Sequence, residues 1–151
     1  MSDLRELYQE VILDHGKKPR NFSKPVGCNR EANGYNPLCG DRVTVYLRVN
    51  DGRIEDVGFS GAGCAISMAS ASLMSEVLKG KTVAEASALF ERFRGSVMGK
   101  EEAAWDDTED LDKLAVLFGV REFPMRVKCA TLAWHAMAAA AQGKTEEVTT
   151  E

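Results

Sequence analysis

The clearest pattern in the chain is an alternation of apolar and more polar residues over 42–49. Its apolar positions are Val43, Val45, Leu47 and Val49. Successive side chains of a strand point to opposite faces, so this segment is predicted to be a strand with one buried face. Asp51 and Gly52 come next and tolerate the positive φ angles of a tight hairpin, which predicts a partner strand over Arg53–Ser60. Ile54 is out of phase with the later apolar residues of that strand, which indicates a β-bulge.

Apolar residues at helical spacing predict helices before and after this hairpin. One short helix is expected over Leu4–Leu13, ending near Gly16, and one short strand fits around Arg30–Gly34. A loop is expected over 95–107. The later helices are expected at about Cys64–Lys79, Thr82–Arg94, Thr108–Gly119 and Met125–Gln142. Strands followed by helices indicate an α+β fold with helices on one face of an antiparallel sheet. We expect a single domain over residues 1–151, with a frayed tail from about residue 145.

Composition and charge narrow the class of protein. The 151 residues are 44% hydrophobic and 28% charged, which suits one globular domain. A net charge of −4 argues against nucleic-acid binding, which depends on phosphate neutralisation. No apolar run approaches the roughly 20 residues of a membrane span, and the first residues lack an apolar signal core. We therefore expect a cytoplasmic protein, in which four cysteines indicate metal or redox chemistry before disulfides.

Three of the four cysteines, together with one aspartate, form the candidate site. Cys39 and Asp41 flank Gly40 just before the strand at 42–49, and a bend at the glycine can direct both side chains to one metal. The alternative is a buried structural cysteine beside a turn aspartate. Three soft sulfurs and one harder, more exchangeable carboxylate, from Cys39, Asp41, Cys64 and Cys129, make a four-ligand set that suits zinc.

Cys64 and Cys129 each lie near the start of a predicted helix. Free backbone N–H groups and the helix dipole stabilise a thiolate at Cys64, whether or not a metal is present. Cys129 shares a helix face with a strip of alanines, which lets its helix approach the Cys64 helix closely. Arg126 lies one turn earlier on nearly the same side, where a guanidinium favours thiolates or an anionic sulfur; the alternative is a solvated surface arginine. For Cys64, the alternative interpretation is a small core residue in the first turn of its helix.

The remaining cysteine and the two histidines are expected outside the site. Cys28 lies in a polar segment with no partner motif, so it is interpreted as a bystander. His15 falls at a helix end, where an imidazole can cap carbonyls. His135 is six residues past Cys129 and so points about 240° around the helix from it.

These motifs also carry a resemblance that spans nearly the whole chain. The chain resembles the SufU branch of the IscU/NifU-like iron–sulfur cluster assembly proteins. The matching stretches are NPLCGD at 36–41, GAGCAIS at 61–67, ASASLM at 69–74 and RVKCATLAWH at 126–135, with shorter ones at 7–8, 11–15 and 19–21. The branch is indicated by Lys128, where IscU scaffolds carry histidine, and by the long interval between Cys64 and Cys129.

The resemblance implies a fold, a metal and a reaction. The fold is a small three-stranded antiparallel sheet with five or so helices packed on one side. The metal is zinc, held by the equivalents of Cys39, Asp41, Cys64 and Cys129. The reaction is transfer of persulfide sulfur from a cysteine desulfurase of the SufS type to the chain, and onward to iron–sulfur assembly proteins. We expect Cys39 to be the acceptor, because a loop residue swings further than a helical one, and Arg126 to assist it.

Two other functions remain open on the same residues. One is an assembly scaffold that binds iron or a transient [2Fe–2S] cluster; Lys128 in place of histidine weighs against it. The other is a zinc-stabilised adaptor that activates the desulfurase without receiving sulfur. Whether the chain counts as an enzyme is left open, because a sulfur acceptor works only together with its desulfurase.

Overall fold

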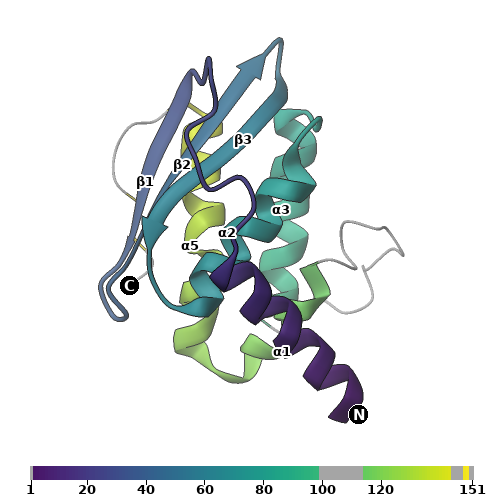
Figure 1. Ribbon diagram of the computed structural model, residues 1–151. Helices are drawn as coiled ribbons and strands as arrows, with labels where there is room; N and C mark the ends of the chain where they lie inside the picture. The colour runs from purple at the N-terminus through teal and green to yellow at the C-terminus, as the bar shows by residue number, and fades with distance from the viewer. Residues whose placement is uncertain (1, 99–113, 144–147, 150–151) are drawn as a thin grey trace.

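A four-stranded mixed sheet carries the helices on one side (Figure 1). The computed structural model describes residues 2–98, 114–143 and 148–149. Its elements are α1 (Ser2–Lys17), β1 (Arg30–Asn36), β2 (Asp41–Asn50), β3 (Arg53–Ala62), α2 (Ala65–Leu78), α3 (Val83–Val97), the 3-10 helix η1 (Ala115–Glu122), α5 (Pro124–Ala141) and β4 (Val148–Thr149). The α+β class is therefore confirmed. The described ranges hold four α-helices and one 3-10 helix, against the five or so helices expected.

The central hairpin follows the prediction from the sequence. β2 and β3 pair antiparallel, and the turn between them uses positive φ angles of 52° at Asp51 and 76° at Gly52. The register shifts between Arg48 and Val49, so that Val49 pairs with Ile54. This shift is the predicted β-bulge. It returns Ile54 to the buried face, where it is 0% exposed.

The end of the chain corrects the expected fold. Residues 148–149 form β4, which pairs parallel with β1 through Gly34 with Val148 and Tyr35 with Thr149. The sheet order is therefore β3-β2-β1-β4, and the expected sheet of three antiparallel strands was wrong. Within the expected frayed tail, residues 148–149 are paired, and the rest of it lies outside the described residues. The physical reason is that β1 would otherwise leave an open edge of backbone donors and acceptors. Val148 also packs against the core while it pairs.

The helices cover the sheet in a layer that is held by small and aromatic side chains. α5 packs across β1 and β2, α2 packs on β3 and α5, and α1 packs on α2 (Figure 1). Buried alanines on α5 allow this close approach. Trp134 of α5 is fully buried and stacks on Phe93 and Phe90 of α3, at centroid distances of 4.9 and 5.9 Å. None of the helices in the described ranges is long and apolar enough to cross a membrane.

Helix boundaries differ from the expected ones where tertiary packing intervenes. The capping box at Thr82 and Glu85 is confirmed, with both reciprocal hydrogen bonds present. α3 continues through Gly95 to Val97, which is 0% exposed, so burial of its last turn outweighs the low helix propensity of glycine. The expected loop over 95–107 was wrong at its start, and the rest of it lies outside the described residues. Thr108 also lies outside them, and η1 continues past Gly119, where its helix was expected to end.

Candidate metal centre

Four chain segments meet at one end of the molecule and bring the predicted ligands together. Cys39 lies in the turn between β1 and β2, and Asp41 is the first residue of β2. Cys64 is the N-cap of α2, directly after β3. Cys129 lies in the second turn of α5. Both helices start at this end because β3 and the segment before Pro124 deliver the chain there.

Asp41 is the buried centre of the group, at 0% exposure. Its Oδ1 accepts a hydrogen bond of 2.9 Å from the backbone N–H of Cys64, and its Oδ2 lies 4.0 Å from the Cys64 Sγ. Gly63 makes this approach possible, because a Cβ there would lie 2.5 Å from Asp41 Oδ1. Gly40, with φ of 73°, supplies the bend between Cys39 and Asp41.

The sulfur atoms are spaced for a shared metal. Cys39 Sγ and Cys129 Sγ lie 3.4 Å apart, although Cys39 is exposed and Cys129 is 0% exposed. Ligand atoms of Cys39, Asp41 and Cys129 all lie within 4.8 Å of one another. Cys64 falls outside this tight group of three and joins it through Asp41. In tetrahedral zinc thiolates the sulfurs are about 3.8 Å apart, as Zn–S bonds of about 2.3 Å require. The donor set therefore fits zinc.

Asn36 belongs to the centre, although the sequence prediction did not single it out. It is 0% exposed, and its Nδ2 lies 3.4 Å from Asp41 Oδ2 and 3.6 Å from Cys129 Sγ. Its Oδ1 accepts a hydrogen bond from the backbone N–H of Leu38. Groups that orient the ligands in this way tune a metal site. The sequence did contain a sign of this role. Ala32, Gly34 and Asn36 alternate on the buried face of β1, and Asn36 is polar at a position where an apolar residue is expected.

The pKa values of the Cys64 and Cys129 thiols shift in opposite directions. The neighbouring Cys129 thiol lowers the pKa of Cys64 to about 6; this contact outweighs burial and Asp41, which raise it, and the backbone N–H groups of Ser67 and Ile66 act in the lowering direction. The same contact raises the pKa of Cys129, as do burial and the neighbouring Asp41 and Cys39. Of the two thiols, Cys64 is therefore the more readily ionised.

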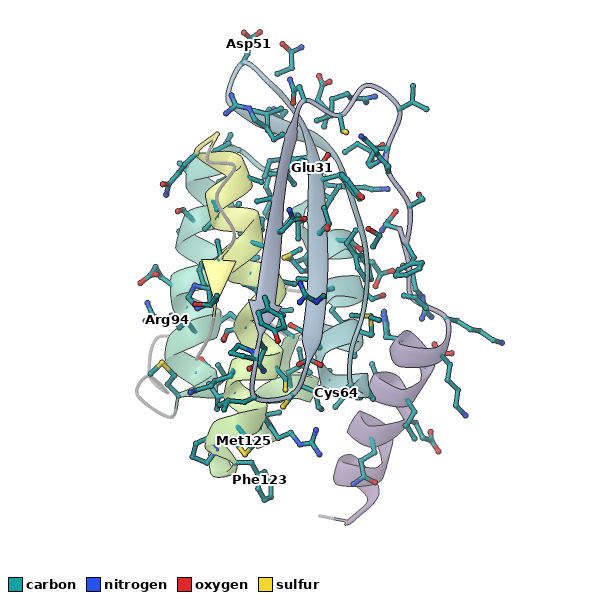
Figure 2. The ribbon with its side chains drawn as sticks, turned by 90° about the vertical axis from the view of Figure 1, so that its left-hand side faces the viewer. Glu31, Asp51, Cys64, Arg94, Phe123 and Met125 are labelled. Atoms are coloured by element: carbon teal, nitrogen blue, oxygen red, sulfur yellow. The ribbon has the colours of Figure 1, made fainter. Side chains whose placement is uncertain are left out.

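Exposed apolar side chains accompany Arg126 at this end of the molecule. Arg126 is exposed in the first turn of α5, one turn before Cys129. Phe123 is 60% exposed and Met125 53% exposed, and Figure 2 shows both at the end where Cys64 lies. Leu38, next to Cys39, is 53% exposed. A partner protein that approaches Cys39 would meet these side chains, and the contribution of Arg126 stays a prediction.

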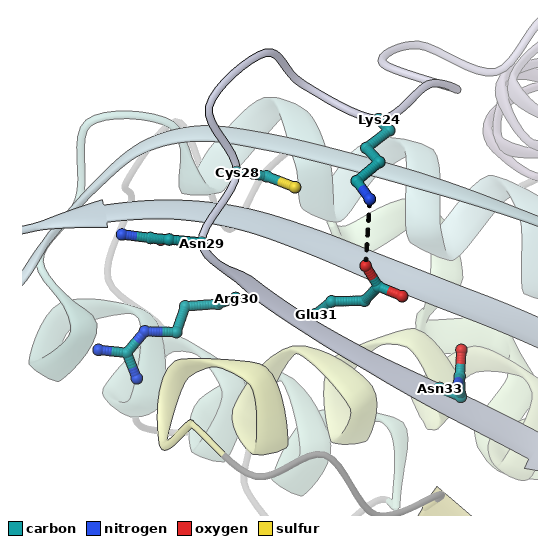
Figure 3. A pocket seen from close by; sticks show the side chains of 6 residues that line it. All are labelled: Lys24, Cys28, Asn29, Arg30, Glu31 and Asn33. Atoms are coloured by element: carbon teal, nitrogen blue, oxygen red, sulfur yellow. Dashed lines mark ion pairs between the residues drawn. The ribbon is translucent and has the colours of Figure 1, made fainter.

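The structure keeps the remaining cysteine and the histidines out of the centre. Cys28 lines a pocket on the outer face of the sheet, beside the ion pair of Lys24 and Glu31 at 3.6 Å (Figure 3). His15 is buried and shares a hydrogen bond of 2.7 Å with Ser72, so its role is structural. A side chain that only capped carbonyls at a helix end would not need this degree of burial. His135 stands edge-on to the Phe90 ring at 5.1 Å, and burial lowers its pKa.

Comparisons with known proteins place this arrangement in a family. The NifU-like N terminal domain family matches residues 7–130. The chain is 41% identical to a zinc-dependent sulfurtransferase, SufU of Bacillus subtilis, over 90% of both chains. It is 39% identical to the iron–sulfur cluster assembly scaffold protein IscU of Streptococcus pyogenes, over 91% of this chain and 84% of that one.

A solved structure supports the same relationship. A protein of Fervidobacterium islandicum AW-1, proposed to be an iron–sulfur cluster assembly scaffold of the SUF system, superposes with a TM-score of 0.80. It shares 36% sequence identity, and the match covers 87% of this chain and 94% of that one. The extent of these matches and the shared fold show that the chain belongs to the IscU/NifU-like family of iron–sulfur cluster assembly proteins, with the NifU-like N-terminal domain as its body.

Proposed function

We propose that the chain is a zinc-dependent sulfurtransferase that accepts persulfide sulfur from a cysteine desulfurase of the SufS type. The observation that carries the proposal is the pairing of an exposed Cys39 with a buried Cys129 at 3.4 Å, beside the buried Asp41. An acceptor must be reachable by a second protein, whereas a stable site needs buried ligands. The zinc-dependent relative from Bacillus subtilis supports the same choice.

Cys39, Asp41, Cys64 and Cys129 would hold the zinc, which supplies a redox-inert charge that keeps the three sulfurs as thiolates. Asp41 and Asn36 orient this set from the buried side. Cys39 is the ligand that leaves, because its side chain is exposed and its backbone lies in a turn. The desulfurase would supply a replacement ligand as Cys39 is freed.

The transfer itself is an exchange between two sulfur centres. The Cys39 thiolate attacks the outer sulfur of the desulfurase persulfide, and a new S–S bond forms on Cys39. The S–S bond on the desulfurase breaks, and its electron pair stays on the desulfurase cysteine as a thiolate. One sulfur atom moves and no external oxidant is needed. Arg126, exposed at the start of the same helix as Cys129, would stabilise the anionic sulfurs during the exchange.

Replacement of Cys39 tests the proposal. The chain is incubated with a SufS-type desulfurase and L-cysteine, and the added sulfur on each cysteine peptide is measured by mass spectrometry. We expect sulfur on Cys39, none in Cys39→Ala, and near-normal uptake in Cys28→Ala, whose thiol lies in the separate pocket. Arg126→Ala should take up sulfur more slowly while it retains zinc. Normal uptake by Cys39→Ala would move the acceptor role to Cys64 or Cys129.

The same ligands favour a second candidate, a scaffold for a [2Fe–2S] cluster, because the IscU relative carries that name. A brown protein with visible charge-transfer absorption and bound iron would support the scaffold. A colourless protein with one zinc supports the transferase. A zinc-containing protein that accelerates the desulfurase and gains no sulfur would be an adaptor.

We place the chemistry in the cytoplasm, where thiols normally stay reduced, because the four cysteines of the chain are free thiols. The sulfur would pass from this chain to other iron–sulfur assembly proteins.

A further inference from the structure

Ser67 carries a buried hydroxyl for which the resting structure provides no partner. It is 1% exposed, and its Oγ makes no hydrogen bond. The other buried serines of α2 are all satisfied: Ser70 donates to the Ala130 carbonyl and accepts from Trp134 Nε1, Ser72 bonds His15, and Ser75 accepts from Asn21. A buried polar group without a partner lowers stability, so its presence here requires an explanation.

Helix geometry places this hydroxyl beside the metal centre. Cys64 is the N-cap of α2, so Ser67 is the third helical residue, and its backbone N–H faces the Cys64 sulfur. Helical side chains lean toward the N-terminus, and the Ser67 hydroxyl therefore leans toward Cys64. Ser70, one turn later on the same face, contacts Ala130 of α5. The orphan hydroxyl thus lies where α2 meets α5, next to Cys64 and close to the turn that carries Cys129.

We propose that Ser67 is a positioning residue whose hydroxyl donates a hydrogen bond to the Cys64 sulfur when that sulfur carries charge as a ligand. The hydroxyl keeps its proton in this interaction. The added donor holds Cys64 in the site while Cys39 exchanges. Cys39 lies in the turn before β2 and is exposed, and its sulfur contacts the sulfur of Cys129. Ser67 therefore decides which thiolate stays and which one leaves, a role that rests on the proposed function.

Alkylation of the full-length, zinc-loaded chain tests this role without a desulfurase. The chain is treated with iodoacetamide at fixed pH, and the modification rates of the Cys39 and Cys64 peptides are followed by mass spectrometry. A hydrogen bond lowers the nucleophilicity of a thiolate, so Ser67→Ala should raise the Cys64 rate about threefold to tenfold and leave the Cys39 rate nearly unchanged. Ser67→Thr retains the hydroxyl and should restore the slow rate.

Thermal melting with a matched control separates this role from a structural one. Ser70→Ala removes a satisfied hydroxyl from the same helix and should lower the melting temperature. In the metal-free chain, where the Cys64 sulfur is not a ligand, Ser67→Ala removes an unsatisfied hydroxyl and should leave the melting temperature unchanged or raise it. The proposal is overturned if Ser67→Ala leaves the Cys64 rate unchanged, or if it destabilises as much as Ser70→Ala.

The two proposals fail in different ways. Absence of sulfur uptake by the unaltered chain would contradict the sulfurtransferase function, while the alkylation rates would still report on Ser67. If the purified chain holds no zinc, zinc is restored before the alkylation is measured. An equal Cys64 rate in Ser67→Ala and in the unaltered chain would then overturn the positioning role.

Discussion

At the scale of single residues, Asp41 joins features that are separate in the sequence. One of its oxygens fixes the backbone of Cys64 at 2.9 Å, and the other faces the sulfur of Cys64 and the amide of Asn36. It therefore fixes where α2 begins and also offers a ligand atom at the centre of the group. Its exposure of 0% means that its charge must be compensated, which a bound cation does directly.

Replacement of Asp41 by alanine should make the proposed zinc site more labile. A carboxylate is a harder and weaker zinc partner than a thiolate, so we expect faster zinc loss with smaller damage than loss of a cysteine causes. The measurement is the rate of zinc release to a chromogenic chelator, with Cys64→Ser as the comparison. An unchanged release rate in Asp41→Ala would show that the carboxylate is not a ligand.

The metal-free protein should show a pH dependence that belongs to Cys64. Its lowered pKa of about 6 means that the thiolate is present above that pH and is lost as the pH falls through it. Alkylation of Cys64 in chelator-treated protein should therefore rise between about pH 5 and 7. Cys129→Ala removes the main hydrogen-bond donor and should move the midpoint to higher pH. A midpoint that does not move would show that the thiol pair is not coupled.

At the scale of elements, helix starts decide both stability and chemistry. α3 begins with a capping box in which Thr82 and Glu85 satisfy each other's backbone N–H groups. α2 begins instead with Cys64, which makes no cap hydrogen bond with its side chain. The N-cap position thus has different roles in the two helices. In α3 the N-cap side chain satisfies a backbone N–H group of the first turn, whereas in α2 these N–H groups stay available to the Cys64 sulfur.

Replacement of Thr82 by alanine should destabilise the fold and leave the metal centre intact. Loss of an N-cap hydroxyl costs roughly 1 kcal/mol of the free energy of unfolding. The check is urea unfolding combined with zinc content. A drop in zinc content at full folding would contradict the separation between this cap and the centre.

At the scale of the whole molecule, the candidate centre joins the turn before β2, β2 itself, α2 and α5. These elements come from sequence positions as far apart as Cys39 and Cys129. A metal that bridges them restrains the folded chain and has no preformed site in the unfolded one, so binding adds to stability.

Removal of zinc should therefore lower the melting temperature of the whole domain. We expect Cys64→Ser to show reduced zinc content and a lower melting temperature than the unaltered chain. Chelator treatment of the unaltered chain should give a similar shift, and added zinc should reverse it. Full zinc content with an unchanged melting temperature in Cys64→Ser would contradict the assignment of the centre.

Much of the architecture could be predicted because it follows from local periodicity. The alternation in β2, the turn at Asp51 and Gly52, the bulge at Ile54 and the cap at Thr82 each depend on neighbouring residues, and the structure contains all four. The motifs around the three site cysteines also indicated which elements would meet. The predicted helix boundaries were wrong where contacts with distant residues determine them. Gly95, for example, stays helical because the end of α3 is buried.

The sequence alone thus determined the fold class, the hairpin, the helix starts and the kinds of candidate ligand atom, since these depend on spacing and side-chain chemistry. Only the tertiary structure decided the parallel pairing of β4 with β1, the place of Asn36 beside Asp41 and Cys129, and the orphan hydroxyl of Ser67. Each of these depends on which surfaces meet when the helices close over the sheet. A contact between residues that are distant in the chain leaves no periodic signal in either segment, because neither segment forms it alone.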